Sequence, residues 1–209
     1  MSITIYTYND KVLKNSSTDK WLKKPDVDPY NPLNLPANTV RVRTSDGNAP
    51  TKAKYTTYET ATLVAGTTDV YDVYKSGTSF RGFLSSSTNV VEVLGANTTG
   101  ITAMDDMFWG CSSLTSIPLF DTSNVTNMNY MFGNCSSLTS IPLFDTSSVT
   151  NMSYMFDYCT NVQSGALALY QQASSQTTPP SNHSYCFYSC GSNTTTGAAE
   201  LAQIPSGWK

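Results

Sequence analysis

The chain has 209 residues, of which 12 are Lys or Arg and 15 are Asp or Glu, giving a formal net charge of −3 at pH 7. Only 13% of the residues are charged, and no apolar run is long enough for a membrane-spanning helix. Nearly all basic residues lie at or before Arg81, whereas the chain beyond it is acidic. The short basic stretch beside an acidic remainder argues against nucleic acid as a partner, and the length allows a repeat array with a smaller companion region.

In chain order, residues 1–24 form a polar, basic segment. It lacks a charged start followed by an apolar run, so no signal peptide is predicted. Two interpretations stay open: an arm that orders on a partner protein, or a solvated terminus. An attachment arm would need apolar anchors, and the candidates are Ile3, Ile5, Tyr6, Tyr8 and Trp21.

Residues 25–36 hold four prolines and are expected to form an extended linker. Residues 37–82 are predicted to be a small β region, because 39–44 alternates apolar and polar residues and 60–64 and 70–74 are further strand candidates. We expect this region to cover one end of the repeats that follow, since an uncovered strand edge promotes aggregation.

The next part of the chain is a repeat. Residues 107–130 and 131–154 are the same 24-residue unit written twice, with 20 of 24 positions identical. A degenerate copy precedes them from Phe83 to Asp106, and a further copy opens at Met155. Periods of this size are typical of stacked repeats, in which one unit buries its apolar side only against the next.

The spacing of Leu114, Ile117 and Leu119 is that of a leucine-rich repeat, and we expect a short strand with Ile117 and Leu119 on its inner side. Asp121 is expected to begin a turn.

Residues 164–173 are predicted to be a helix with a Ser N-cap, and 197–203 a second one. The expected fold is therefore mainly β with short helices: a leucine-rich-repeat-type solenoid of 24-residue coils over 83–163. The β region is expected to cap one end, and residues 164–209 the other with an irregular last coil and helices.

The repeat unit resembles that of a known group of proteins. The unit LTSIPLFDTSNVTNMxxMFxxC resembles the BspA-like leucine-rich repeats of bacterial surface proteins and the related repeat of mycoplasma surface lipoproteins. It covers about residues 83–190. The resemblance implies a surface-exposed binding protein or adhesin without catalytic residues. Similar repeats in phages of gut bacteria imply a phage-encoded member as a further possibility.

Sequence features that could carry catalysis or bind a metal are few. His183, the only histidine, lies in a loop with no acidic residue nearby, so a catalytic role is not predicted. If Cys111, Cys135 and Cys159 stack, they would be close enough for a disulfide. Three stacked cysteines cannot all pair, however, so buried thiols are favoured. No second Cys pair accompanies Cys186 and Cys190, so zinc is not expected. Asp121 and Asp145 could attract calcium, although turn capping explains them better. Six methionines recur in repeat slots and are predicted to be core: Met104, Met107, Met128, Met131, Met152 and Met155.

Differences between the copies gather at four positions that flank the Met-Phe pair of each unit. The residues there include Trp109, Tyr130, Tyr154 and Tyr158. Exposed aromatic side chains on a rigid Ser/Thr/Asn-rich frame suit contact with sugars or protein loops. The alternative is that these positions lie in exposed turns, where the sequence varies without any role in binding.

The sequence thus favours a non-enzymatic structural or binding protein with no cofactor or metal. The first expectation is a phage virion component, such as a fibre, decoration or receptor-binding protein, located on the virion. The alternative is a bacterial cell-surface adhesin of the BspA-like type. Expected partners are other virion or surface proteins through the arm and a host protein or glycan through the repeats, with a homo-oligomer as a further alternative.

Overall fold

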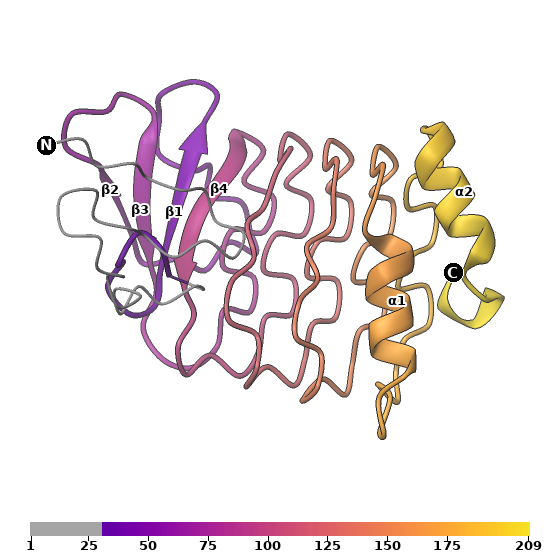
Figure 1. The fold of residues 1–209 in the computed structure, drawn as a ribbon. Coiled ribbons are helices and arrows are strands. Elements are labelled where there is room, and N and C mark those ends of the chain that lie inside the picture. Colours follow the sequence, from indigo (N-terminus) through magenta and orange to yellow (C-terminus); the bar gives the residue numbers. More distant parts are fainter. Residues whose placement is uncertain (1–30) are drawn as a thin grey trace, which may run out of the picture.

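The computed structural model describes residues 31–209, so the predicted arm residues Ile3, Ile5, Tyr6, Tyr8 and Trp21 lie outside the described residues. Figure 1 shows a sheet at one end, helices at the other, and a row of looped segments between them. The elements are β1 (Thr39–Thr44), β2 (Thr60–Leu63), β3 (Val70–Tyr74), β4 (Val90–Asn97), α1 (Ala166–Ser174), α2 (Thr195–Gln203) and a 3₁₀ turn (Ser206–Trp208).

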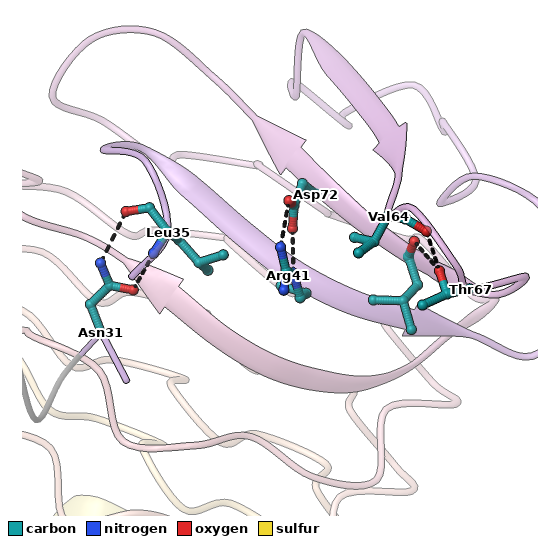
Figure 2. Close-up of polar contacts among 7 residues, drawn as sticks. Asn31, Leu35, Arg41, Val64, Thr67 and Asp72 are labelled. Carbon is teal, nitrogen blue, oxygen red and sulfur yellow. Dashed lines mark hydrogen bonds and ion pairs between the residues drawn. The ribbon is translucent and has the colours of Figure 1, made fainter. Parts of the chain in front are cut away.

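The four strands form one open antiparallel sheet in the order β2-β3-β1-β4. Alternation in β1 places Val40 and Val42 in the core, while Arg41 and Arg43 lie on the other face. On that face Arg41 makes a two-pronged ion pair with Asp72 of β3, with N–O distances of 2.7 and 2.8 Å (Figure 2). The sheet thus has one apolar face, which packs toward the repeats.

The described part of the proline-rich segment is not the extended linker that the sequence predicts. The Asn31 side chain closes a turn by accepting from the Leu35 N–H (2.8 Å) and donating to the Leu35 carbonyl (3.0 Å), as Figure 2 shows. Leu35 is buried, and Leu33 lies so near β4 that a Cβ on Gly95 would be 2.9 Å from its Cδ1. This segment therefore packs on the sheet.

The prediction of a mainly β, leucine-rich-repeat solenoid is wrong. The only sheet described is the open antiparallel one, and no strand occurs between Asn97 and Ala166. Repeat units contact one another through isolated bridges, such as Ala103 with Asn127 and Asn127 with Asn151, rather than through a continuous ladder. We call each 24-residue unit a layer, counted from the first layer, residues 83–106, which contains β4; Figure 1 shows the layers side by side from β4 to α1.

The reason lies in the backbone of each layer. Over the Met-Phe segment, alternate N–H groups donate to the next layer, as Phe132 does to the Met155 carbonyl (2.9 Å), while the N–H groups between them donate within the layer, as Cys135 does to Phe132 (3.0 Å). A chain that divides its donors in this way makes turns, not a strand. At the predicted strand, Pro118 and Pro142 remove one donor per layer.

The core runs through the layers as columns of like side chains. The six predicted core methionines are all fully buried, which confirms that prediction. Phe132 stacks on Phe108 (ring centroids 5.3 Å apart) and on Phe156 (5.2 Å). The expected inward position of Leu119 is only partly confirmed: Leu119 is half-buried, and its counterpart Leu143 is 52% exposed. Phe120 and Phe144 fill that part of the core instead.

Both ends of the row of layers are covered. The loop around residues 51–58 lies on the first layer, where the N–H of Thr57 donates to Gly82 (3.0 Å) and that of Tyr58 to Phe83 (3.2 Å). At the other end α1 begins after Gly165, and no side chain of its own segment caps it, so the predicted Ser N-cap is wrong. Glu200 of α2 accepts from the N–H of Leu167 (3.1 Å) in its place. Within residues 31–209, no helix combines the length and apolarity needed to cross a bilayer.

The cysteines are buried, as predicted, and none is paired in a disulfide. The thiols of Cys111, Cys135 and Cys159 each donate to the carbonyl of the residue 27 positions earlier, at 3.1 Å. Burial raises the pKa of Cys111 to about 12 and raises those of Cys135 and Cys159 well above the ordinary value.

Phe132→Ala should cost about 3–5 kcal/mol of unfolding free energy, because the ring is fully buried between two stacked neighbours. Urea denaturation of the full chain measures this. Leu143→Ala is the matched control, since Leu143 is half-exposed and should lose less than about 0.5 kcal/mol. A loss below about 1 kcal/mol for Phe132→Ala would show that the inner face is assigned wrongly.

The thiols should resist a thiol reagent until the protein unfolds, because the thiolate is the reactive form. Their folded pKa values lie above the unfolded value of about 8.5, so their contribution to stability is complete below that pH and declines as pH rises toward about 12. Above pH about 8.5, Cys111→Ala should flatten the pH dependence of the unfolding free energy by about 1.4 kcal/mol per pH unit. An unchanged slope would contradict this.

Candidate functional site

Two of the four variable positions of the repeat carry a positive φ angle. Residues with positive φ recur in pairs four positions apart; within the 24-residue repeat, the first ends one layer and the second is the fourth residue of the next, and both positions are among the four variable ones. The pairs are Asp106 and Gly110, Tyr130 and Asn134, Tyr154 and Tyr158, and Tyr185 and Ser189. A positive φ brings a cost for tyrosine of order 1–3 kcal/mol, so packing around these tyrosines must hold them in place.

Three of the tyrosines form a continuous stack along this edge. Tyr130 and Tyr154 are parallel within 3°, with ring centroids 4.5 Å apart, and Tyr154 and Tyr185 are 5.2 Å apart. Because each ring covers the face of the next, the inner faces are not free to stack on a sugar. This part of the predicted binding edge presents ring edges and hydroxyl groups.

A groove lies beside this stack, with Trp109 and Tyr158 among its lining residues. Tyr158 is 46% exposed, and Trp109 is half-buried against the next layer, where a Cβ on Gly133 would come 3.1 Å from its Cδ1. The groove has a volume of about 540 Å³. Its other lining residues are small and polar or glycine: Ser86, Thr88, Gly110, Ser112, Asn134, Ser136 and Thr160.

The structure thus places the four predicted edge residues in one region, but in two roles. Tyr130 and Tyr154 belong to the stack, whereas Trp109 and Tyr158 line the groove. Tyr185 and Tyr188 extend the same edge and were missed by sequence reasoning; Tyr188 meets Tyr158 edge-on at 5.4 Å. Their signal was the final F-x-x-C motif, which lies 31 residues after its counterpart and so fell outside the 24-residue comparison.

Asp157 is a buried acid at this edge. It occupies the slot of Trp109 and Gly133 in its own layer and is only 7% exposed. Burial raises its pKa to about 6. Its carboxylate also contributes to raising the pKa of Tyr130, after burial and Tyr154. Asp157 therefore titrates in the mildly acidic range, next to the tyrosines.

The other candidates have structural roles or stay untested. Asp121 and Asp145 accept from the N–H groups of Ser123 (3.0 Å) and Ser147 (2.8 Å), which confirms the predicted turns. His183 stacks on Trp208 with ring centroids 4.2 Å apart. Among residues 31–209, no group of three His, Cys, Asp or Glu side chains is arranged to hold a metal ion.

Stability should depend on pH through Asp157. Its pKa is higher in the folded chain than the unfolded value of about 3.9. Protonated Asp157 therefore stabilises the fold below pH about 4, and this contribution is lost as pH rises through about 6. A pKa raised from about 3.9 to about 6 corresponds to about 3 kcal/mol of unfolding free energy. Asp157→Asn should be more stable than the wild type at pH 7 and equal to it at pH 4, measured by urea denaturation. A constant difference at both pH values would contradict this assignment.

Comparison with known proteins agrees with part of the resemblance stated above. A family model described as "Mycoplasma protein of unknown function, DUF285" matches residues 68–195, more than half of the chain. No curated protein and no solved structure matches. The match spans β3, β4, every repeat layer and α1. The chain therefore belongs to the DUF285 family of mycoplasma proteins of unknown function.

Proposed function

We propose that the chain is a non-enzymatic binding protein of an outer surface and that its ligand lies in the groove between Trp109 and Tyr158. The observation that carries the proposal is the composition of this groove, with two aromatic side chains among small hydroxyl and amide residues. Aromatic rings contact the apolar faces of sugars and protein loops, and hydroxyl and amide groups orient a polar ligand. A host glycan or surface protein is the proposed partner.

The layers give this groove a rigid frame. The groove residues Gly110 and Asn134 belong to adjacent layers, and their N–H groups donate to Gly133 (2.8 Å) and Asp157 (2.7 Å) of the layers that follow. The groove walls are thus fixed by backbone bonds rather than by mobile side chains. A preorganised site loses less conformational entropy on binding, which suits recognition of a surface ligand.

The place of display is part of the proposal. The virion of a phage is the first candidate and the surface of a bacterial cell the alternative, and immunogold labelling with an antibody against the repeats distinguishes them. Attachment is proposed to use residues 1–24, with Ile3, Ile5, Tyr6, Tyr8 and Trp21 as anchors. A segment that orders on its partner gives up part of its binding energy, so such anchors are needed.

Trp109→Ala and Tyr158→Ala should each weaken ligand binding about tenfold or more, as is typical for central aromatic contacts. The full chain is screened on an array of neutral and acidic glycans and on host cells, and the affinity for each hit is then measured by calorimetry. Tyr74→Ala is the matched control, because Tyr74 is an exposed aromatic residue of β3 outside the groove. Equal effects of all three variants, or none, would overturn the groove as the site.

A further inference from the structure

A second hollow opens where the β region meets the first layer. It has a volume of about 650 Å³, within the range of small-molecule sites. Trp109 lines both this hollow and the groove. We call it the junction pocket; its lining includes Lys54, Tyr55, Lys75, Arg81, Ser85 and Trp109.

The pocket exists because the 51–58 loop lies directly on the first layer. Thr56 donates its hydroxyl to the Ser85 carbonyl (2.6 Å), and Thr57 donates its hydroxyl to the Arg81 carbonyl (2.7 Å). Gly82 has φ +61°, and a Cβ there would lie 2.6 Å from the Tyr55 carbonyl oxygen. A glycine is therefore required for the loop to approach so closely.

Three cationic side chains line the pocket. Lys54 and Lys75 have no carboxylate within 4.0 Å among residues 31–209, whereas Arg41 and Arg43 of the sheet are paired with acids. Lys75 donates to the Arg81 carbonyl (3.3 Å), and burial lowers its pKa despite attraction from Glu59. A partly desolvated ammonium group without an acidic partner gains from an incoming anion.

The acids beneath the pocket are largely offset. Asp105 is buried and pairs with Arg81 at 3.0 Å, and the Arg81 side chain is still 72% exposed. Burial and the charge of Asp105 raise the pKa of Asp106. Among the lining residues Lys54, Lys75 and Arg81 outnumber the single acid, Asp106, so the lining keeps a positive balance, with Glu59 and Asp105 attracting Lys75 from outside the lining.

Ser85 adds an unused polar group. It is 1% exposed, and within the described chain its hydroxyl has no hydrogen-bond partner. Buried polar groups are nearly always paired, and Ser85 is one of the residues that line the pocket, so its hydroxyl is an unsatisfied polar group at the pocket wall. Tyr55, 59% exposed, and Trp109 add aromatic walls that suit the apolar face of a sugar ring.

We propose that the junction pocket binds an acidic sugar, with its carboxylate at Lys54 and Lys75, its ring against Tyr55 and Trp109, and a hydroxyl group at Ser85. The inference rests on the proposed function. Because Trp109 lines both sites, the acidic sugar in the junction pocket would be the end of a glycan whose neutral part lies in the groove. The inference goes further by assigning the chemical class of the ligand and a second subsite.

The test measures binding of N-acetylneuraminic acid to the full chain by calorimetry and by NMR chemical-shift changes. The methyl ester of the same sugar is the uncharged control ligand. The acid should bind about tenfold more tightly than the ester, because an ionised partner strengthens the hydrogen bonds. Added salt should weaken binding of the acid. Glucuronic acid and glucose form a second pair of charged and uncharged sugars, for which the same comparison of affinities is made.

Lys54→Met and Lys75→Met should each reduce the affinity for the acid about tenfold and leave that for the ester unchanged. Lys52→Met is the control, since Lys52 lies over the Tyr58 ring at 4.3 Å and does not line the pocket. The melting temperature of each variant checks that the fold is intact. Equal binding of acid and ester, or inorganic phosphate binding as tightly as the acid, would overturn the inference.

The two proposals fail in different ways. If neutral glycans bind and respond to Tyr158→Ala while the acid and ester bind alike, the groove stands and the acidic subsite falls. If the acid binds and responds to Lys75→Met but no ligand responds to Tyr158→Ala, the junction pocket stands and the groove proposal falls.

Discussion

The structure depends on one backbone interaction that recurs from layer to layer. An N–H group donates to the carbonyl of the residue 23 positions later, as in Met104 to Asn127 (2.9 Å), Phe108 to Met131 (2.9 Å) and Phe132 to Met155 (2.9 Å). This fixed offset places each side chain against its counterpart in the next layer. The phenylalanine and methionine columns follow from it, because identical side chains then occupy equivalent positions in successive layers.

The same interaction determines which residues can vary. N–H groups between those that bridge the layers donate to the residue three positions earlier, and positive φ occurs in the same segment at Tyr130 and Asn134. The inward residues of each layer are constrained by packing, whereas the side chains at these turns lie at the edge. Sequence differences between layers therefore gather where a ligand could make contact, and Trp109 and Tyr158 occur in only one layer each.

Periodicity and residue type were enough to predict the buried methionines and the Asp121 turn, because each depends on the identity of a residue that recurs at the 24-residue spacing. It could not predict the absence of strands, since the division of backbone donors is not visible in side-chain patterns. The exposed Leu143 has the same cause: an L-x-x-L-x-L spacing suggests a strand, but the chain turns after Pro142 and buries Phe144 instead. The groove follows from the register of the layers, and its residues come from several of them.

The junction between the β region and the first layer differs from every other contact in the row. Between two layers, equivalent residues meet, so their surfaces match and leave little space. At the junction the partner is the 51–58 loop, which supplies only some of the backbone donors that a layer would, through Thr57 and Tyr58, and brings Lys54 and Tyr55 to the pocket. Repetition cannot fill the space there. A hollow with unmatched cations and an unpaired Ser85 hydroxyl is thus a consequence of ending a repeat on an unrelated partner, and the end of the repeat is where this chain can gain a chemically distinct site.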